Sequence, residues 1–260
     1  MNAPLRSPAI EAHAISKRFG QVEALHDVTL SAPTGAVTCL LGDNGAGKST
    51  LIKVLSGVFR PDSGQLLVRG SEVSFASPRQ ALDAGVSTVF QDLATIPLMS
   101  IVRNFFLGRE PLRASRLVDW DAAERTARAA LGEMGITLRD GSQPVGTLSG
   151  GERQSLAIAR ALHFGASVLI LDEPTSALGV REAANALRHV ETARDRGIAV
   201  ILITHNVTHA YAVGDRFVVL DHGTVSAERS RADVTSSELQ DLMSGSRELQ
   251  ELLRSTGTSD

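Results

Sequence analysis

The sequence predicts an α/β fold in which helices flank a mainly parallel sheet. Strand-like apolar runs alternate with helical patterns, which is typical of parallel strands joined by crossover helices. The runs are AVTCLL at 36–41, VSTVF at 86–90, SVLIL at 167–171, IAVILI at 198–203 and RFVVL at 216–220. A glycine-rich loop follows the first run, and a helical stretch interrupts the alternation after the second. We therefore expect one α/β core with a helical insertion.

The composition and net charge argue against several classes of protein. A chain of 260 residues is long enough to bury a core, and 26 basic against 29 acidic residues give a net charge of −3. This balance lacks the basic excess of a dedicated nucleic-acid binder. The single Cys39 rules out an internal disulfide and, beside Leu40 and Leu41, favours a buried strand thiol in a reducing cytoplasm. Residues 1–10 lack a signal-peptide core and the apolar runs are too short to span a bilayer, so any membrane role requires a partner.

The glycine-rich loop matches the phosphate-binding pattern G-x-x-x-x-G-K-[ST] from Gly42 to Ser49. Its backbone N–H groups would wrap phosphates, Lys48 would reach the β- and γ-phosphates of ATP, and the Ser49 hydroxyl would ligate Mg²⁺. The alternative is a glycine turn with a surface lysine. The predicted nucleotide-binding residues here are Gly42, Asp43, Asn44, Gly45, Ala46, Gly47, Lys48, Ser49 and Thr50.

Polar side chains follow three of the other expected strands. The run VLILDEP at 168–174 ends in Asp172, a candidate Mg²⁺ ligand, and Glu173, which would polarise the water that attacks the γ-phosphate. A solvated acidic turn is the alternative, and Pro174 would suit it. Gln91 and His205 each follow a strand at the edge where α/β sheets bind ligands. We expect both to face the γ-phosphate, with Gln91 also a metal ligand, although a purely structural His205 is the alternative.

Between Gln91 and about Phe164 the sequence is helical, with DAAERTARAALGEM at 121–134. The segment after Gln91 has Ile101, Phe105 and Phe106 at helical spacing, and these would form either a docking surface or the core of this subdomain. The stretch LSGGE at 148–152 opens a further helix, and the free N–H groups of a helix N-terminus bind anions. Ser149, Gly150 and Gly151 are therefore candidate phosphate contacts, although one ATP in one subunit hardly needs two such loops.

These patterns divide the chain into three regions. We expect an ATP-binding core at 1–91 and 165–230, a helical subdomain at 92–164, and a helical tail at 231–260. In the tail, TSSEL reads as a capping box from Thr235 to Glu238 that starts a polar helix. Leu239, Leu242 and Met243 would share one side of that helix.

The P-loop, a glutamine after a strand, LSGGE, LDEP, SALG and a TH after a strand occur in this order. From about residue 10 to 230 this pattern resembles the nucleotide-binding subunit of ABC transporters. The resemblance implies a RecA-like P-loop NTPase core with a helical subdomain. It also implies a head-to-tail dimer in which Leu148 to Glu152 of one subunit close over the ATP of the other.

The same resemblance assigns Phe19 to stacking on adenine, with a plain core phenylalanine as the alternative. The sequence departs from the family pattern at two positions. Asp43 stands where many relatives have Glu, and Gly179 replaces the usual aspartate of the segment that crosses the dimer interface.

The stretches SALGVRE, QDLATIPLMSIVRNFFLGRE and ITHNVTHAYAVGDRFVVLDHG resemble the branch that drives bacterial uptake of monosaccharides and related polyols. The expected protein is an ATP-hydrolysing importer subunit that pairs with a second copy of itself. It would dock peripherally on integral-membrane permease subunits at the cytoplasmic face of the inner membrane, indirectly served by an extracytoplasmic solute-binding protein. We expect no nucleic acid partner.

The same residues are compatible with other functions. One is a transporter ATPase for amino acids or lipids, and another is a soluble, non-transport ABC ATPase. A regulatory module that holds ATP without hydrolysing it is disfavoured, because Lys48, Asp172, Glu173 and His205 occur together.

Overall fold

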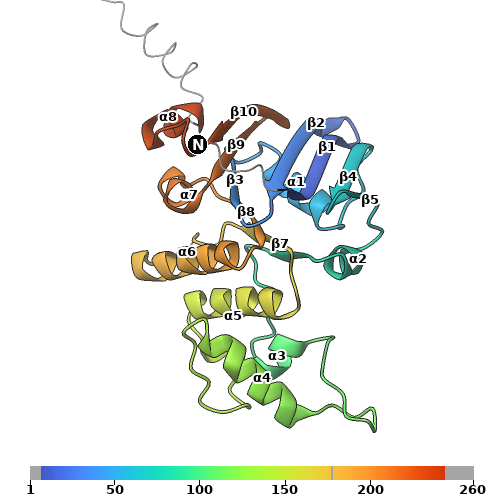
Figure 1. Ribbon diagram of the computed structural model, residues 1–260, viewed down its shortest axis with the longest axis vertical. Coiled ribbons are helices and arrows are strands. Elements are labelled where there is room, and N and C mark those ends of the chain that lie inside the picture. The colour runs from blue at the N-terminus through green and yellow to red at the C-terminus, as the bar shows by residue number, and fades with distance from the viewer. Residues whose placement is uncertain (1–6, 177, 244–260) are drawn as a thin grey trace, which may run out of the picture.

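The computed structural model describes residues 7–176 and 178–243 (Figure 1). Within them, the larger sheet contains six strands in the order β10-β9-β3-β8-β7-β6. The strands from β9 to β6 are parallel, and β10 joins the edge antiparallel to β9. Their bounds are β3 (Val37–Leu41), β6 (Val86–Val89), β7 (Val168–Asp172), β8 (Ala199–Ile203), β9 (Arg216–Asp221) and β10 (Thr224–Ser230). The predicted α/β class is confirmed, and the five expected runs correspond to β3, β6, β7, β8 and β9.

A second, antiparallel sheet was not predicted. It has the order β2-β1-β4-β5 and is formed by β1 (Pro8–Phe19), β2 (Val22–Pro33), β4 (Ser63–Val68) and β5 (Ser71–Val73). Its strands alternate buried and exposed positions and contain irregularities in register, so they lack the continuous apolar runs of the parallel strands. Figure 1 shows this sheet beside β3 and α1 (Lys48–Leu55).

Alternate residues of β3 enter different cores. Leu40 packs in a cluster with the antiparallel sheet and α1, including Ile10 and Leu51. Cys39 and Leu41 pack on the opposite face against the helices that cover it. These helices are α6 (Val180–Asp195), α7 (Val207–Val213) and α8 (Ser236–Met243). Because β3 is buried on both faces, the loop that follows it is fixed relative to both layers.

The segment between β6 and β7 is helical and has a core of its own. It contains α3 (Ile101–Phe106), α4 (Trp120–Gly132), the 3₁₀ turn η1 (Val145–Thr147) and α5 (Gly150–His163). Ile101, Phe105, Leu131 and Leu156 are among the buried residues of this third cluster. Figure 1 shows α3 and α4 beyond α5, on the side away from the sheets. The short helix α2 (Pro78–Asp83) precedes β6. The exact domain boundaries at 91, 165 and 231 stay predictions.

The predicted capping box at the start of the C-terminal helix is present. The N–H of Glu238 donates to the Thr235 hydroxyl, and the N–H of Thr235 donates to the Glu238 carboxylate. Leu239 is fully buried, whereas Leu242 is exposed. The remainder of the expected tail, 244–260, lies outside the described residues, as does Ala177 of the SALG stretch. No helix in the described ranges has the length and apolar character needed to cross a membrane.

Candidate active site

The carboxyl ends of four neighbouring strands carry most of the residues that the sequence singled out. β3, β8, β7 and β6 are adjacent in the larger sheet. The glycine-rich loop follows β3, and His205 lies just after β8. Asp172 ends β7 and Glu173 follows it, while Gln91 lies just after β6. Parallel strands bring these segments to one edge, the usual ligand-binding edge of an α/β sheet. Gln91 itself is exposed at this edge.

The loop from Gly42 to Gly47 requires glycine at two positions. Gly42 has φ 144°, and a Cβ there would lie 2.2 Å from the carbonyl oxygen of Leu220. Gly47 has φ 103°, and a Cβ there would lie 2.7 Å from the carbonyl oxygen of Ala24. Both conformations favour glycine, and both positions lack space for a side chain. The pattern that matched the phosphate-binding motif thus corresponds to a tightly turned backbone leading into α1.

The side chain of Lys48 lies back over this loop. Its Nζ donates to the carbonyl oxygens of Gly42 at 2.6 Å and Asp43 at 2.8 Å, and the residue is only 8% exposed. Burial lowers the pKa of Lys48. The carboxylates of Glu173, Asp43 and Asp172 oppose that shift. The alternative of a surface lysine is therefore wrong.

Backbone donors surround Lys48. Within the described part of the chain, the N–H groups of Gly47, Lys48 and Ser49 have no acceptor, as expected for the first turn of a helix. Together with a buried ammonium group, they offer an anion several donors at one place.

Asp172 and Glu173 form a partly buried carboxylate pair. Burial is the largest cause of the raised pKa of Asp172, and the neighbouring Glu173 adds to it. Lys48 and Lys53 act in the opposite direction. A cation near such a pair would stabilise the ionised form of both carboxylates. The side chain of Glu173 is 13% exposed, which excludes the alternative of a solvated acidic turn.

Glu173 is held by three consecutive residues at the end of β8. Its backbone has φ 48°, and its N–H donates to the carbonyl of Ile203 at 2.9 Å. Its carboxylate accepts from the Thr204 hydroxyl at 3.2 Å and from the His205 N–H at 3.0 Å. The Nδ1 atom of His205 lies 2.8 Å from the same carboxylate oxygen as that N–H. The Thr204 contact was missed by sequence reasoning, because nothing in the pattern distinguishes its hydroxyl from that of any strand-end threonine.

The second glycine-rich stretch caps α5. Ser149 accepts from the Glu152 N–H at 3.2 Å and donates its own N–H to the Glu152 carboxylate at 2.7 Å. Gly151 lies against the start of α6, since a Cβ there would be 3.2 Å from Cβ of Glu182, and Gly150 lies against the side chain of Leu178. Figure 1 shows α5 beyond α6 and away from α1. Among the described residues, no hydrogen bond or ion pair joins 148–152 to the loop at 42–50.

Phe19 and Gly179 are two further positions that the family resemblance singled out. Phe19 ends β1, is 43% exposed and lies edge-on to Phe59 at 5.2 Å between ring centroids, so the alternative of a core phenylalanine is wrong. Gly179 precedes α6 and donates its N–H to the Glu182 carboxylate at 3.3 Å. Because glycine has no side chain, position 179 offers no carboxylate to a neighbouring subunit.

The docking surface suggested for Ile101, Phe105 and Phe106 is wrong. All three side chains are buried in the helical subdomain, and the two phenylalanine rings lie 5.0 Å apart. Helical spacing identified a shared apolar face, which α4 and α5 cover. The other interpretation, a subdomain core, is confirmed.

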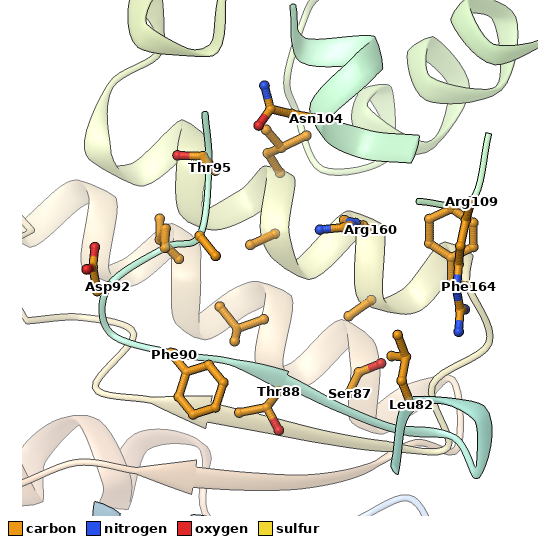
Figure 2. Close-up of a pocket in the computed structure, with 16 residues that line it drawn as sticks. Leu82, Ser87, Thr88, Phe90, Asp92, Thr95, Asn104, Arg109, Arg160 and Phe164 are labelled. Atoms are coloured by element: carbon orange, nitrogen blue, oxygen red, sulfur yellow. The ribbon is translucent and has the colours of Figure 1, made fainter. Parts of the chain in front are cut away.

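A groove instead lies between β6 and α5 (Figure 2). It has a volume of about 200 Å³ and contains residues on both sides of Gln91, including Phe90, Asp92 and Leu93. Arg160 and Phe164 line it from the side of α5. Figure 2 shows the segment from Thr88 to Thr95 running along this groove.

Comparison with known proteins agrees with this geometry. The family model described as "ABC transporter" matches residues 25–176, which include the loop at 42–50, the LSGGE stretch and Glu173. This chain belongs to the ABC transporter family. It is 40% identical to a fructose import ATP-binding protein of Rhizobium meliloti, over 94% of this chain and 96% of that protein. It is also 40% identical to a xylose/arabinose import ATP-binding protein of Sulfolobus acidocaldarius, over 91% and 94% of the two chains.

Other ABC transporter relatives are longer. A ribose import ATP-binding protein of Streptomyces coelicolor is 41% identical over 95% of this chain, but the match spans 48% of that protein.

Solved structures share the fold. The ADP conformation of an ATP-binding cassette of an ABC transporter superimposes with a TM-score of 0.79 at 24% identity, covering 90% of this chain and 95% of that one. A dimeric bacterial ABC transporter cassette gives 0.74 at 23% identity, covering 85% and 98%. The predicted family and P-loop NTPase fold are confirmed, and the names of the relatives agree with the prediction of an importer ATPase.

Proposed function

We propose that this chain is the ATP-hydrolysing subunit of an ABC importer for a monosaccharide or a related polyol. The observation that carries the ATPase assignment is the placement of Lys48, the Asp172–Glu173 pair and His205 at the ends of three adjacent strands. The sugar class rests on the fructose and xylose/arabinose import proteins, which this chain matches over nearly their full length.

The loop from Gly42 to Thr50 holds the phosphates of ATP. The free N–H groups of Gly47, Lys48 and Ser49 donate to phosphate oxygens, and the ammonium group of Lys48 leaves its two carbonyl partners for the β- and γ-phosphates. The exposed ring of Phe19 stacks on the adenine.

The residues present fit a magnesium ion that takes most of its ligands from phosphate and water. The partly buried carboxylate of Asp172 beside Glu173 suits a cation, and Mg²⁺ bound with a nucleotide takes the rest of its ligands from phosphates and water. Within residues 7–176 and 178–243 no group of three His, Cys, Asp or Glu forms a metal cluster. Ser49, Asp172 and Gln91 would hold the magnesium ion. Bound there, the ion would neutralise charge on the β- and γ-phosphates.

Hydrolysis uses Glu173 as the base. A water oxygen attacks the γ-phosphorus, its proton passes to the Glu173 carboxylate, and the bond from that phosphorus to the β,γ-bridging oxygen breaks, releasing ADP. The ring of His205 turns from Glu173 towards the γ-phosphate, to which its N–H donates.

The two glycine-rich loops serve one ATP from different subunits. Ser149, Gly150 and Gly151 of one copy donate to the γ-phosphate held by the P-loop of a second copy. Two features support this head-to-tail arrangement: the separation of α5 from α1 within one chain, and the exposure of Ser149 at the start of α5. Each site is then complete only in a dimer.

The permease docks in the groove of Figure 2. An apolar lining beside Gln91 suits a short helix from a cytoplasmic loop of the permease. A displacement of that helix shifts the segment 87–95, and through it Gln91 beside the nucleotide. The chain is accordingly peripheral at the cytoplasmic face of the membrane, with a solute-binding protein acting on the opposite side.

Purification of the tagged full-length chain from membranes tests this function. We expect an integral-membrane permease to accompany it, and the ATPase of the reconstituted complex to rise with a monosaccharide or polyol and its binding protein. Stimulation only by amino acids or lipids would contradict the sugar assignment. If no permease accompanies the chain from membranes, whatever its own ATPase activity, a soluble ABC ATPase would be favoured.

A further inference from the structure

Thr204 lies between the P-loop strand and the strand of the proposed base. It follows β8 directly and is 1% exposed. Its N–H donates to the carbonyl of Leu40 in β3 at 3.3 Å, and its hydroxyl reaches Glu173 at the end of β7. The side chain therefore has little freedom to move relative to either strand.

The hydroxyl of Thr204 has a defined direction. Its oxygen accepts the N–H of Asn206 at 3.0 Å, so its single proton is available for Oε2 of Glu173 at 3.2 Å. Asn206 is itself fixed as the cap of α7, where its Oδ1 accepts from the His209 N–H at 3.0 Å. A chain of hydrogen bonds thus runs from a helix terminus to the carboxylate.

The two oxygens of Glu173 have different partners. Oε1 faces the N–H and the ring of His205, whereas Oε2 has the Thr204 hydroxyl. In the proposed function the ring of His205 turns to the γ-phosphate, which leaves the Thr204 hydroxyl and the His205 N–H on the carboxylate. The φ of 48° at Glu173 is costly for a residue with a side chain, and such a conformation persists where neighbours hold it.

We propose that Thr204 is a positioning residue that orients the carboxylate of Glu173 towards the attacking water. The proposal rests on the proposed function, in which Glu173 is the base. Because a small misplacement of a base slows proton transfer strongly, the loss of this contact should act on turnover and not on nucleotide binding.

The test compares Thr204→Val, which removes the hydroxyl and keeps the shape, with Thr204→Ser, which keeps the hydroxyl. In the full-length chain with Mg²⁺-ATP, we expect Thr204→Val to lower kcat roughly 10- to 100-fold. The KM for ATP should change less than about twofold, and Thr204→Ser should restore most of the rate. Thr38→Val is the matched control, because Thr38 is a buried β3 threonine whose hydroxyl has no partner among the described residues.

A double-mutant cycle separates this proposal from a general loss of stability. Adding Thr204→Val to Glu173→Gln should leave the residual rate unchanged, since Thr204 acts through Glu173. A normal kcat in a folded, ATP-binding Thr204→Val, or equal losses in Thr204→Ser, would overturn the proposal; Thr204→Ala repeats the test if the valine variant does not fold. A normal rate in Glu173→Gln would instead contradict the proposed function, and the Thr204 proposal with it.

Discussion

The ammonium group of Lys48 donates to the carbonyl oxygen of Gly42, six residues earlier in the same loop, at 2.6 Å. The loop therefore supplies its own temporary acceptors for a buried cation. We propose that a phosphate entering the loop replaces those carbonyls with stronger, charged acceptors. The free N–H groups of the same loop are available at the same time.

Replacement of Lys48 by alanine should abolish productive ATP binding. Loss of charge-assisted hydrogen bonds to the β- and γ-phosphates, each worth about 1.5–3 kcal/mol, predicts an affinity at least roughly 100-fold lower. Isothermal titration with ATP measures the change. Arg79→Ala is the control, because it removes a cation that is highly exposed on α2. Unchanged affinity and turnover in Lys48→Ala would count against the P-loop assignment.

Glu173→Gln should retain ATP and lose turnover. The amide keeps the shape of the side chain but does not take the proton of the attacking water, so kcat should fall about 10²- to 10⁴-fold. We expect ATP that is bound and not hydrolysed to keep bridging the two subunits. Light scattering should show a monomer without nucleotide and a dimer with Mg²⁺-ATP. Normal hydrolysis would show that Glu173 is not the base. A tight dimer without nucleotide would instead contradict closure driven by ATP.

The sequence predicted the parts of the site that are continuous along the chain. The loop at 42–50 lies between a buried strand and a helix, and both neighbours were visible as patterns. It also placed Glu173 and His205 at the same edge of the sheet. The order β8-β7, which brings these two side chains within hydrogen-bond distance, depends on crossover connections that carry no local signal.

Strands with one exposed face, and the partners of an apolar helix face, were harder to predict from the sequence than the fully buried strands. β1 and β2 expose polar side chains on one face, so their sequences resemble ordinary polar segments. The spacing of Ile101 and Phe105 correctly indicated one apolar face. The sequence did not show that α4 and α5 cover this face, because that packing is tertiary.

Phe105→Ala should destabilise the protein, because its ring is fully buried against Phe106 and the ring of His163. Removal of a buried phenylalanine side chain costs about 3–5 kcal/mol. Urea unfolding followed by circular dichroism measures the loss. Leu98→Ala is the control, since Leu98 is 93% exposed and its truncation should change stability by at most about 0.5 kcal/mol. Equal stability of the two variants would contradict the assignment of Phe105 to the subdomain core.

We propose that the P-loop of one subunit and the LSGGE stretch of another form one ATP site. Lys48→Ala and Ser149→Arg should each inactivate a homodimer, the first by loss of the phosphate contact and the second by bulk against the ATP of its partner. Ser149→Arg should still bind ATP at its own P-loop, which provides a check that it folds despite the loss of its helix cap.

Mixing the two variants tests the claim most directly. In the mixed dimer both lesions fall on one composite site, and the other site keeps an intact Lys48 and an intact Ser149. We predict that partial ATPase activity appears on mixing. The absence of activity, with mixed dimers shown to form and one-site turnover established in a tethered dimer, would contradict the claim.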